Sequence, residues 1–513
     1  MEKNKKYYCK SRREGGSMTL YLTLIITLIF SFFFSLLESA RVQALDCAAK
    51  RNILLKLESA LGEYQIDLWK NYRLLFLDGG NDMEELDLAL LEGRMMEESI
   101  LQQKGNGFYQ KALQDLEITA YSLATDQQGA AFKKQACKVI KEQLALKAAE
   151  ALKQKLKEGE RMAEKSEDME KQWDSAREAM SDAEEWEKKE AADINQESDG
   201  MQTQPDQPEA FAPRKDLPEN PVDSVDLLKK SAILPLVVEN PAEVSAKFIS
   251  LQDTLGRRNI SQGNLELPGG GILDKVWFLQ YLNYYFSCET GEGKVKDQEH
   301  ALDYELEYCI AGNSSDQENL EKTVKKLLLI REAGNFATIM QDGKKQALAL
   351  EIATAAVGFT GIPPLIQAVQ IGILLAWSYI ESILDVRCLL SGGKIPLVKQ
   401  ITDWKSDVSL GGEVLKEKKE QAQNQEQGLD YREYLQVLLL LVPEDILVLR
   451  AMDVIEHNIR QENPFFRMNH QIHGMQIEGL YRAQPLFLGF LTGVKVKTDY
   501  YHFRKSCKDF YLK

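Results

Sequence analysis

The chain has 513 residues, 44% of them hydrophobic and 27% charged, so it is long enough to form more than one folded unit with its own core. Acidic residues outnumber basic residues by 78 to 63, which gives a formal net charge of −15. This balance argues against nucleic acid as a partner, because neutralising phosphates requires clustered lysine and arginine.

The seven cysteines lie far apart and form no CxxC pair, so their spacing does not fit a zinc knuckle or a redox dithiol. Export from the cytoplasm would allow Cys288 to pair with Cys309. Buried free thiols are nevertheless the favoured interpretation, since the set is odd in number and dispersed.

Residues 1–16 form a short basic leader, and residues 17–37 are predicted to form a single transmembrane helix. The run from Met18 to Leu37 has no charge, proline or glycine. Twenty residues at about 1.5 Å each span a hydrocarbon core of about 30 Å. The predicted contacts with the lipid bilayer are made by Met18, Leu20, Leu22, Leu24, Ile25, Leu28, Phe32, Phe33, Leu36 and Leu37.

The flanks of this segment predict its orientation. Six basic residues precede it against two acidic ones, and positive flanks stay in the cytoplasm. We therefore expect a single-pass protein of the cell membrane, with a cytoplasmic N-terminus and most of the chain outside the cytoplasm.

Three fates are open to the apolar segment. Signal peptidase cleavage after Ala44 fits the small-x-small preference loosely, but the run is longer than the 7–15 residues usual in a signal peptide. Lipoprotein cleavage before Cys47 is disfavoured by Leu45 and Asp46. Retention as a stem is favoured because apolar residues continue every three or four positions beyond the membrane. This predicted packing face consists of Val42, Leu45, Ala49, Ile53 and Leu57.

The stem interpretation predicts one helix of about 45 residues from Ser17 to Leu61, which Gly62 would end. Its first half would be the anchor, and its second half would carry one apolar face for a globular head. The alternative is an ordinary signal anchor followed by a separate helix.

A basic leader that ends at Gly16, followed by Ser17 and an unbroken apolar helix, resembles the minor pseudopilins of tight-adherence (Tad-type) pilus systems. The stretches GSMTLYLTLIITLIFSFFFSLLESARVQA, YRLLFLDGG and GIPPLIQAVQIGILLAWSYIESILDVRCLLSGGKIPLVK resemble an uncharacterised bacterial membrane-anchored family with a domain of unknown function. The resemblance implies cleavage between Gly16 and Ser17, and envelope or pilus-assembly proteins as partners. It implies no catalytic residue. Tyr21 stands where substrates of the prepilin peptidase usually carry glutamate.

Residues 38–140 are predicted to be the helical stem and the N-terminal part of the head, with breaks at 78–81 and 105–107. Residues 141–193 are highly charged and predict a long helix. A heptad seam of about two repeats at Met169, Trp173, Ala176, Met180 and Ala183 allows a coiled coil, with self-association through residues 162–183. A solvated single or paired helix is the alternative. Residues 194–222 are rich in proline and polar residues, which predicts a disordered linker.

Residues 223–513 are predicted to be a C-terminal α+β domain. Helices are expected over 277–286, from the Ser315/Glu318 capping box to about Met340, and from Pro443 to about Gln461. Two apolar helices, 345–360 and 365–389, carry charged residues and so predict a buried hairpin in place of a second membrane pass. Residues 411–428 read as a mobile loop.

Alternating apolar and polar residues predict three strands. They cover 302–310, 475–484 and 493–506, the first being half-buried. The predicted fold class is therefore α+β and dominated by helices, with a long N-terminal membrane helix, a charged helical spacer and linker, and C-terminal helices on a small antiparallel sheet.

Few residues of the chain have the type and spacing of a catalytic or metal site. His470 and His473 have a spacing that suits a metal, with Glu456, His457 or Glu478 as a third ligand. Because they lie where a loop enters a strand, surface or capping roles are favoured. Pro268 to Gly271 lacks the lysine of a phosphate loop and reads as a turn. Glu305 and Glu307 share one strand face and are expected to face solvent, and the aromatic residues of 277–286 read as core packing.

The sequence therefore predicts no catalytic residue, cofactor or metal. The leading hypothesis is a non-enzymatic, membrane-anchored structural subunit that resembles a pilus- or secretion-associated minor pseudopilin. A signal-anchored binding or scaffold module comes second, and a membrane-tethered hydrolase third.

Overall fold

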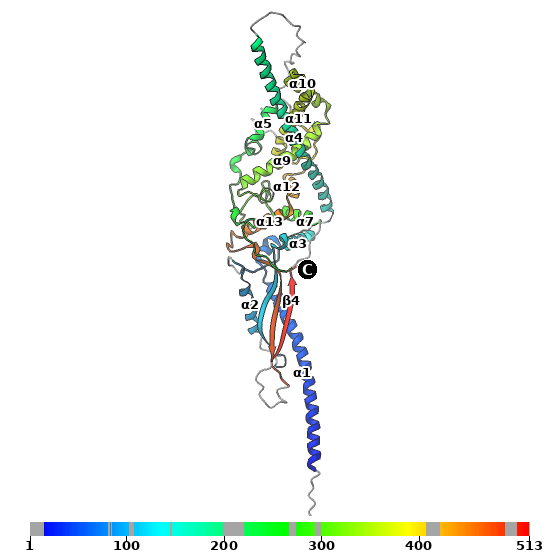
Figure 1. Cartoon of the computed structure of the whole chain (residues 1–513), viewed down its shortest axis with the longest axis vertical. Coiled ribbons are helices and arrows are strands. Elements are labelled where there is room, and N and C mark those ends of the chain that lie inside the picture. The colour runs from blue at the N-terminus through cyan, green and yellow to red at the C-terminus, as the bar shows by residue number, and fades with distance from the viewer. Residues whose placement is uncertain are drawn as a thin grey trace, which may run out of the picture.

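The computed structural model describes residues 15–80, 83, 85–101, 107–143, 146–197, 220–265, 273–291, 293, 299–406, 421–487 and 500–511. The molecule is elongated (Figure 1). An N-terminal helix projects from one end, a small sheet lies beside the upper part of this helix, and a body of helices forms the rest. The fold is α+β and dominated by helices, as predicted.

The N-terminal helix α1 (Gly15–Gly62) is continuous over 48 residues, about 72 Å at the standard rise. The predicted end at Gly62 is correct. Within the described residues, α1 from Met18 onward is the one helix that is long and apolar enough to cross a membrane.

The sheet is antiparallel and has β3 (Gln471–Ala483) at its centre. Three strands pair with β3: β2 (Ala112–Leu123), β4 (Tyr501–Phe510) and the short β1 (Leu77–Asp78). The predicted strand 475–484 corresponds to β3. The predicted strand 493–506 overlaps β4 from Tyr501 to Ser506, and its residues 493–499 lie outside the described residues.

The prediction of a helical segment up to residue 140 is wrong at β2. This strand comes between α2 (Leu88–Leu101) and α3 (Asp126–Gln143). Its backbone partner is β3, with Leu116 opposite Gly479 and Ile118 opposite Ile477. Because the partner strand lies almost 350 residues or more away in the sequence, the chain around β2 gave little sign of the pairing.

The predicted strand 302–310 is also wrong, because this segment forms α8 (Glu305–Ala311). All seven residues of α8 are buried, including both glutamates. The alternation of acidic and apolar residues therefore does not indicate one solvent-exposed face and one buried face. The glutamates are held by internal hydrogen-bond donors, which the sequence pattern could not show.

The predicted helices of the body are present as α7 (Leu273–Tyr285), α9 (Asp316–Ile339), α10 (Gly343–Val357), α11 (Pro363–Leu390) and α13 (Glu444–Ile459). The body also contains α5 (Val222–Lys230), α6 (Leu234–Val237) and α12 (Tyr431–Leu441), which were not predicted. Ser315 caps α9 by accepting from the Glu318 backbone N–H, as expected. The predicted hairpin of apolar helices is formed by α10 and α11, and α11 is buried from Gly372 to Leu389.

The charged helix α4 (Leu146–Glu197) is a single element of 52 residues. Its heptad seam packs on α11 and α9 of the same chain. Met169, Trp173, Ala176 and Ala183 are all buried there. The surface that a coiled-coil partner would use is therefore covered within the molecule. Residues 198–219 of the expected linker and 411–420 of the expected loop lie outside the described residues.

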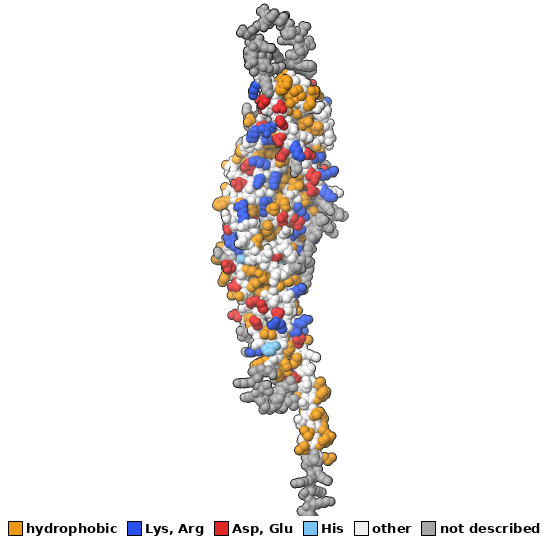
Figure 2. Space-filling model, viewed as in Figure 1, with side chains coloured by type: hydrophobic (Ala, Val, Ile, Leu, Met, Phe, Trp, Pro, Cys, Tyr) orange, Lys and Arg blue, Asp and Glu red, His pale blue; other side chains and the backbone are white. Residues whose placement is uncertain are grey.

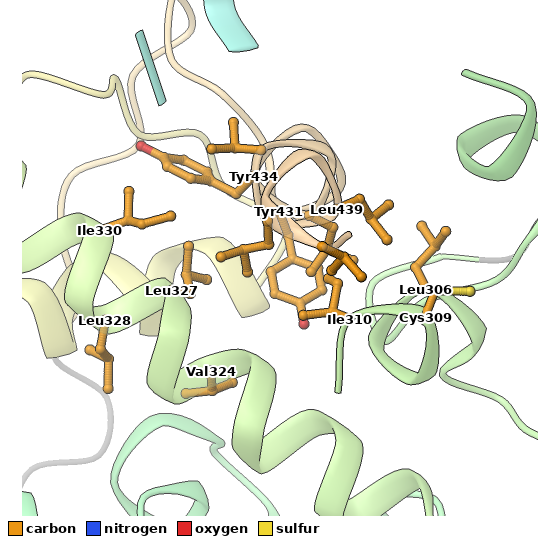
Figure 3. Packing of buried hydrophobic residues seen from close by; sticks show 14 of the residues in the cluster. Leu306, Cys309, Ile310, Val324, Leu327, Leu328, Ile330, Tyr431, Tyr434 and Leu439 are labelled. Atoms are coloured by element: carbon orange, nitrogen blue, oxygen red, sulfur yellow. The ribbon is translucent and has the colours of Figure 1, made fainter. Parts of the chain in front are cut away.

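Two hydrophobic cores follow from this arrangement. The larger one fills the helical body, where residues of α8, α9 and α12 interlock (Figure 3). The smaller one lies between α1, α2 and the sheet. The second core joins the N-terminal helix to the rest of the protein.

Candidate functional site: the junction of the N-terminal helix and the sheet

The second half of α1 is embedded in the smaller core. Leu45, Ala49, Ile53 and Leu57 are fully buried, and Val42 is partly buried beside them. They face β3 and β4, whose contributions to this core include Ile477, Tyr481 and Phe503.

Close approach of the helix depends on Gly479 of β3. A Cβ atom at this position would lie 2.9 Å from Cδ1 of Ile53. The absence of a side chain therefore allows α1 to lie directly on the sheet.

The junction begins with a buried ion pair, Glu38 and Arg41, each 2% exposed. Arg41 Nη1 lies 3.1 Å from Glu38 Oε1 and donates to the carbonyl of Gln484 at 2.9 Å. Arg41 Nε donates to the carbonyl of Phe108 at 2.8 Å.

Glu38 in turn accepts from the backbone N–H groups of Leu486 and Phe487, at 3.2 Å and 2.7 Å to Oε2. The pair thus ties α1 to two segments that lie far away in sequence.

Polar ties continue along the stem. Lys505 Nζ of β4 lies 2.7 Å from Asp46 Oδ1. Lys56 Nζ donates to the carbonyl of Met95 in α2 at 2.6 Å. The hydroxyl of Tyr511 donates to the carbonyl of Leu61 at 2.5 Å. These contacts fix the rotation of α1 about its axis as well as its position.

Among the described residues, the first half of α1 makes few contacts outside its own helix. Its large apolar side chains project freely, and Figure 2 shows them as the orange lower part of the molecule. Exposure reaches 70% at Leu28 and 65% at Phe32. The predicted anchor residues are exposed or, at Leu37, half-exposed. One helix therefore changes from an all-round apolar surface to a packed stem at Glu38.

Neither Glu38 nor Arg41 was predicted to have a role in the site. The available signal was an i,i+3 pair of opposite charge directly after twenty uncharged residues. Leu486 and Phe487 gave no comparable signal, because their importance comes from their position in space.

The helical body holds a second buried polar cluster, which we call the α9–α11 charge cluster: Arg331, Glu381, Asp385 and Lys399. All four side chains are fully buried. Asp385 accepts from Arg331 Nη2 at 2.8 Å and from Lys399 Nζ at 2.8 Å. Burial raises the pKa of the Asp385 carboxyl, but the two cations outweigh burial, so this pKa lies below its usual value.

The α9–α11 charge cluster holds the segment after α11 against the body. Arg331 Nη1 donates to the carbonyls of Pro396 and Leu397 at 2.7 Å and 3.0 Å. The Ser406 N–H donates to Glu381 Oε2 at 2.9 Å. The charges of two cations and two anions balance each other within the cluster. The α9–α11 charge cluster therefore has the features of a structural contact that fixes this segment in place.

Glu305 and Glu307 were predicted to face solvent, but both side chains are buried against other segments of the chain. Glu305 accepts from the Ser287 N–H at 2.7 Å and from Asn458 Nδ2 at 2.6 Å. Glu307 Oε1 accepts from the Tyr431 hydroxyl and from the Glu289 N–H, both at 3.0 Å. Burial raises the pKa of Glu307 to about 7 despite these hydrogen bonds.

The three candidate histidines, His457, His470 and His473, are buried, which corrects the expected surface position. His473 lies in β3, with Nδ1 3.2 Å from Nε2 of Gln135 and its ring beside Phe76 and Phe510. Burial lowers the pKa of His457 and of His470, so both are neutral at neutral pH. The residues that the structure describes contain no group of three side chains suited to hold a metal.

The aromatic residues of α7 lie in the core. Phe278 and Tyr281 of α7, and Phe286 directly after it, are fully buried, and the Tyr281 hydroxyl donates to the carbonyl of Tyr72 at 2.9 Å. The six described cysteines are free thiols: Cys137, Cys288, Cys309 and Cys388 are buried, Cys507 is half-buried and Cys47 is exposed. The proposed turn at 268–271 lies outside the described residues.

Two clefts follow α4 where it crosses α9. One, of about 470 Å³, is lined in part by Trp173, Lys229, Glu332 and Tyr379. Lys229 Nζ lies 4.1 Å from the Trp173 ring centre, 4.9 Å from that of Tyr379 and 2.9 Å from Glu332 Oε1. The other, of about 680 Å³, is lined in part by Lys322, Lys326, Leu441 and Arg450. Their volumes lie in the range of small-molecule sites.

A family model described as a family of unknown function (DUF5702) matches residues 213–483, slightly more than half of the chain. The matched range includes the α9–α11 charge cluster and β3, and it begins after α1 and α4. The likeness of the N-terminal segment to Tad-type pseudopilins therefore stays an expectation. Neither the curated proteins nor the solved structures yielded a match.

Proposed function

The chain belongs to the DUF5702 family of unknown function, and we propose that it is a non-enzymatic, single-pass structural protein of the cell envelope. In this proposal the first half of α1 crosses the cytoplasmic membrane, and the sheet and helical body form a head outside the cytoplasm. The bilayer is the first partner, and envelope or pilus-assembly proteins are the next.

One observation carries this proposal: a single helix has a free apolar half and a half that is built into the core of the head. A cleaved signal peptide would need no such continuity. Removal of the chain before Leu45 would also remove Glu38 and Arg41 from the junction. The basic leader supports the orientation by the positive-inside rule.

The anchor is tested by charge substitution in α1. An arginine near the centre of a membrane helix costs about 2.5–3.5 kcal/mol. We expect the double variant Leu28→Arg/Phe32→Arg to leave the membrane fraction on alkaline carbonate extraction, while the unmodified chain stays. Leu55→Arg is the matched control, because Leu55 is 54% exposed on the same helix beyond the apolar half.

Orientation is tested in the same cells by adding protease to spheroplasts. Digestion of the head supports the proposal. A protected head with an accessible leader would overturn the orientation, and release of the Leu55→Arg control would show that the carbonate assay is not specific for the anchor.

The finer proposal is a minor pseudopilin of the Tad type, in which α1 bundles with similar helices. The measurement is the intact mass of the protein from purified membranes. A mature chain that starts at Ser17 supports processing by a prepilin peptidase, in spite of Tyr21. An intact leader would overturn this finer proposal and favour a signal-anchored scaffold.

The second candidate function, a binding or scaffold module, is supported by the cleft at Trp173 and Tyr379. This cleft belongs to the head and does not depend on the fate of the leader. A start at Leu45 would instead indicate a secreted protein and overturn the anchor.

A further inference from the structure

The end of the sheet nearest the first half of α1 carries four apolar side chains that the described residues leave exposed or half-exposed. Phe108 and Tyr109 come from the segment before β2, and Leu486 and Phe487 from the segment after β3. We call these four residues the proximal tip. Tyr109 is 51% exposed and Leu486 is 47% exposed.

The proximal tip is fixed to α1 within the apolar run. The ring of Phe487 stacks on Phe34, with centroids 6.1 Å apart and planes 12° apart. The ring of Phe108 also contacts Phe487, with centroids 6.2 Å apart. The Glu38 carboxylate holds both backbone N–H groups of Leu486 and Phe487, so the tip cannot move independently of the helix.

The position of Phe34 sets the depth of the tip. If the apolar run from Met18 to Leu37 fills a hydrocarbon core of about 30 Å, the boundary lies at Leu37. Phe34 is three residues before it, about 4.5 Å deeper along the helix. The Phe487 backbone is held at Glu38 and its ring contacts Phe34, so this side chain reaches from the boundary toward the apolar run while the rest of the sheet stays above it.

The neighbours of the tip suit this position. Aromatic side chains are enriched where membrane meets water, and basic side chains beside them contact lipid phosphates. Lys111 lies directly before β2, and Arg482 lies opposite Ala112 near the end of β3. Arg482 is placed over the ring of Tyr500, 5.1 Å from its centre.

We propose that the proximal tip inserts into the outer interface of the bilayer and forms a second membrane contact beside α1. This inference rests on the proposed function, because it requires α1 in the membrane. The consequence is a head with a fixed tilt and rotation relative to the bilayer, in contrast to a head on a flexible tether.

The test uses the full chain in vesicles of phosphatidylethanolamine and phosphatidylglycerol. Cys9, Cys47 and Cys507 are changed to serine, since the other cysteines are buried. A nitroxide label is then placed by Leu486→Cys or, separately, by Tyr109→Cys. Collision rates with oxygen, which partitions into lipid, and with a nickel chelate, which stays in water, report the depth.

Two reference labels make the result decisive. Leu28→Cys marks the centre of the anchor, and Ser506→Cys marks an exposed site on β4 away from the tip. We expect labels at Leu486 and Tyr109 to collide severalfold more with oxygen than with nickel, between the two references. Water-like rates at both tip sites, with a lipid-like rate at Leu28, would overturn this inference alone. A water-like rate at Leu28 would overturn the proposed anchor itself.

Discussion

Charged side chains are buried in this molecule where segments distant in sequence meet. Arg41 joins α1 to Phe108 and Gln484, and Arg331 joins α9 to the segment after α11. Each cation is paired with a carboxylate and also satisfies backbone carbonyls. Such a pair contributes little net stability over apolar residues, but the loss of one partner leaves an uncompensated buried charge.

The first prediction concerns Arg41. Arg41→Met leaves Glu38 buried without its cation, and we expect the free energy of unfolding of the head to fall by about 3–5 kcal/mol. Urea unfolding of the detergent-solubilised chain measures it. The double variant Glu38→Gln/Arg41→Met should recover a large share of the loss, since the two side chains are coupled.

Arg51→Met is the control, because Arg51 is exposed on the same helix ten residues later. Its effect should stay within about 0.5 kcal/mol. A loss in Arg41→Met no larger than in this control would contradict a structural role of the ion pair.

The second prediction concerns pH. The folded state raises the pKa of Glu307 from 4.5 to about 7, so the folded protein binds more protons than the unfolded chain between these values. The free energy of unfolding should therefore be highest below pH 4.5 with respect to this group, and fall as pH rises towards 7. Asp453 and Glu289, with pKa values raised by burial to about 7, add in the same direction.

Glu307→Gln imitates the protonated side chain and keeps an oxygen for Tyr431 and Glu289. We expect it to reduce the difference in stability between pH 5 and pH 8 by on the order of 2–3 kcal/mol, in urea unfolding at both values. Glu351→Gln, at an exposed position of α10, should leave the difference unchanged. An equal pH dependence in Glu307→Gln and the unmodified chain would disprove the assignment.

At the scale of elements, small residues decide where α4 lies. The Cβ atom of Ala176 would be 2.6 Å from a Cβ atom added at Gly372 of α11. A Cβ atom at Gly159 of α4 would lie 2.3 Å from Cγ1 of Val437 in α12. The charged helix can therefore lie flat on the body at these two crossings, and its heptad seam is used inside the chain.

The third prediction compares two glycines within helices. Gly372→Ala forces α4 and α11 apart, and we expect a loss of about 1–3 kcal/mol from overpacking. Gly93→Ala in α2, where an added Cβ meets no atom within 4 Å, should instead stabilise by about 0.5–1 kcal/mol. Thermal unfolding of both variants gives the signs. A stabilising Gly372→Ala would show that α4 does not pack on α11 at this position.

At the scale of the whole molecule, the head includes the second half of α1. Residues 45–61 supply one wall of the smaller core, and β3 and β4 supply the other. The head is therefore not separable from the stem, and a boundary drawn at Gly62 would divide a hydrophobic core.

The fourth prediction follows from this boundary. A chain of residues 38–513 keeps Glu38, Arg41 and the packing face, and we expect a soluble monomer by size-exclusion chromatography with light scattering. A chain of residues 63–513 exposes the apolar face of β3 and β4, and we expect it to aggregate. A soluble, folded 63–513 chain would contradict the joint core of stem and sheet.

The sequence by itself determined the features that depend on local patterns. An uncharged run of twenty residues, followed by apolar residues every three or four positions, was enough to predict α1 and its end at Gly62. Helix caps and apolar periodicity located α9, α10, α11 and α13. These signals lie within one element, so no knowledge of the rest of the chain was needed.

Only the tertiary structure decided which polar groups are buried and which partners they have. Glu305 and Glu307 have the spacing of residues on the solvent-exposed face of a strand, yet they form part of a buried helix. Their carboxylates can be buried because Ser287, Asn458 and Tyr431 supply hydrogen-bond donors from other segments. The same applies to β2, to the heptad seam of α4 and to the contact of Glu38 with Leu486 and Phe487. In each case the stabilising free energy comes from a contact between residues far apart in sequence. A local sequence pattern does not indicate such a contact.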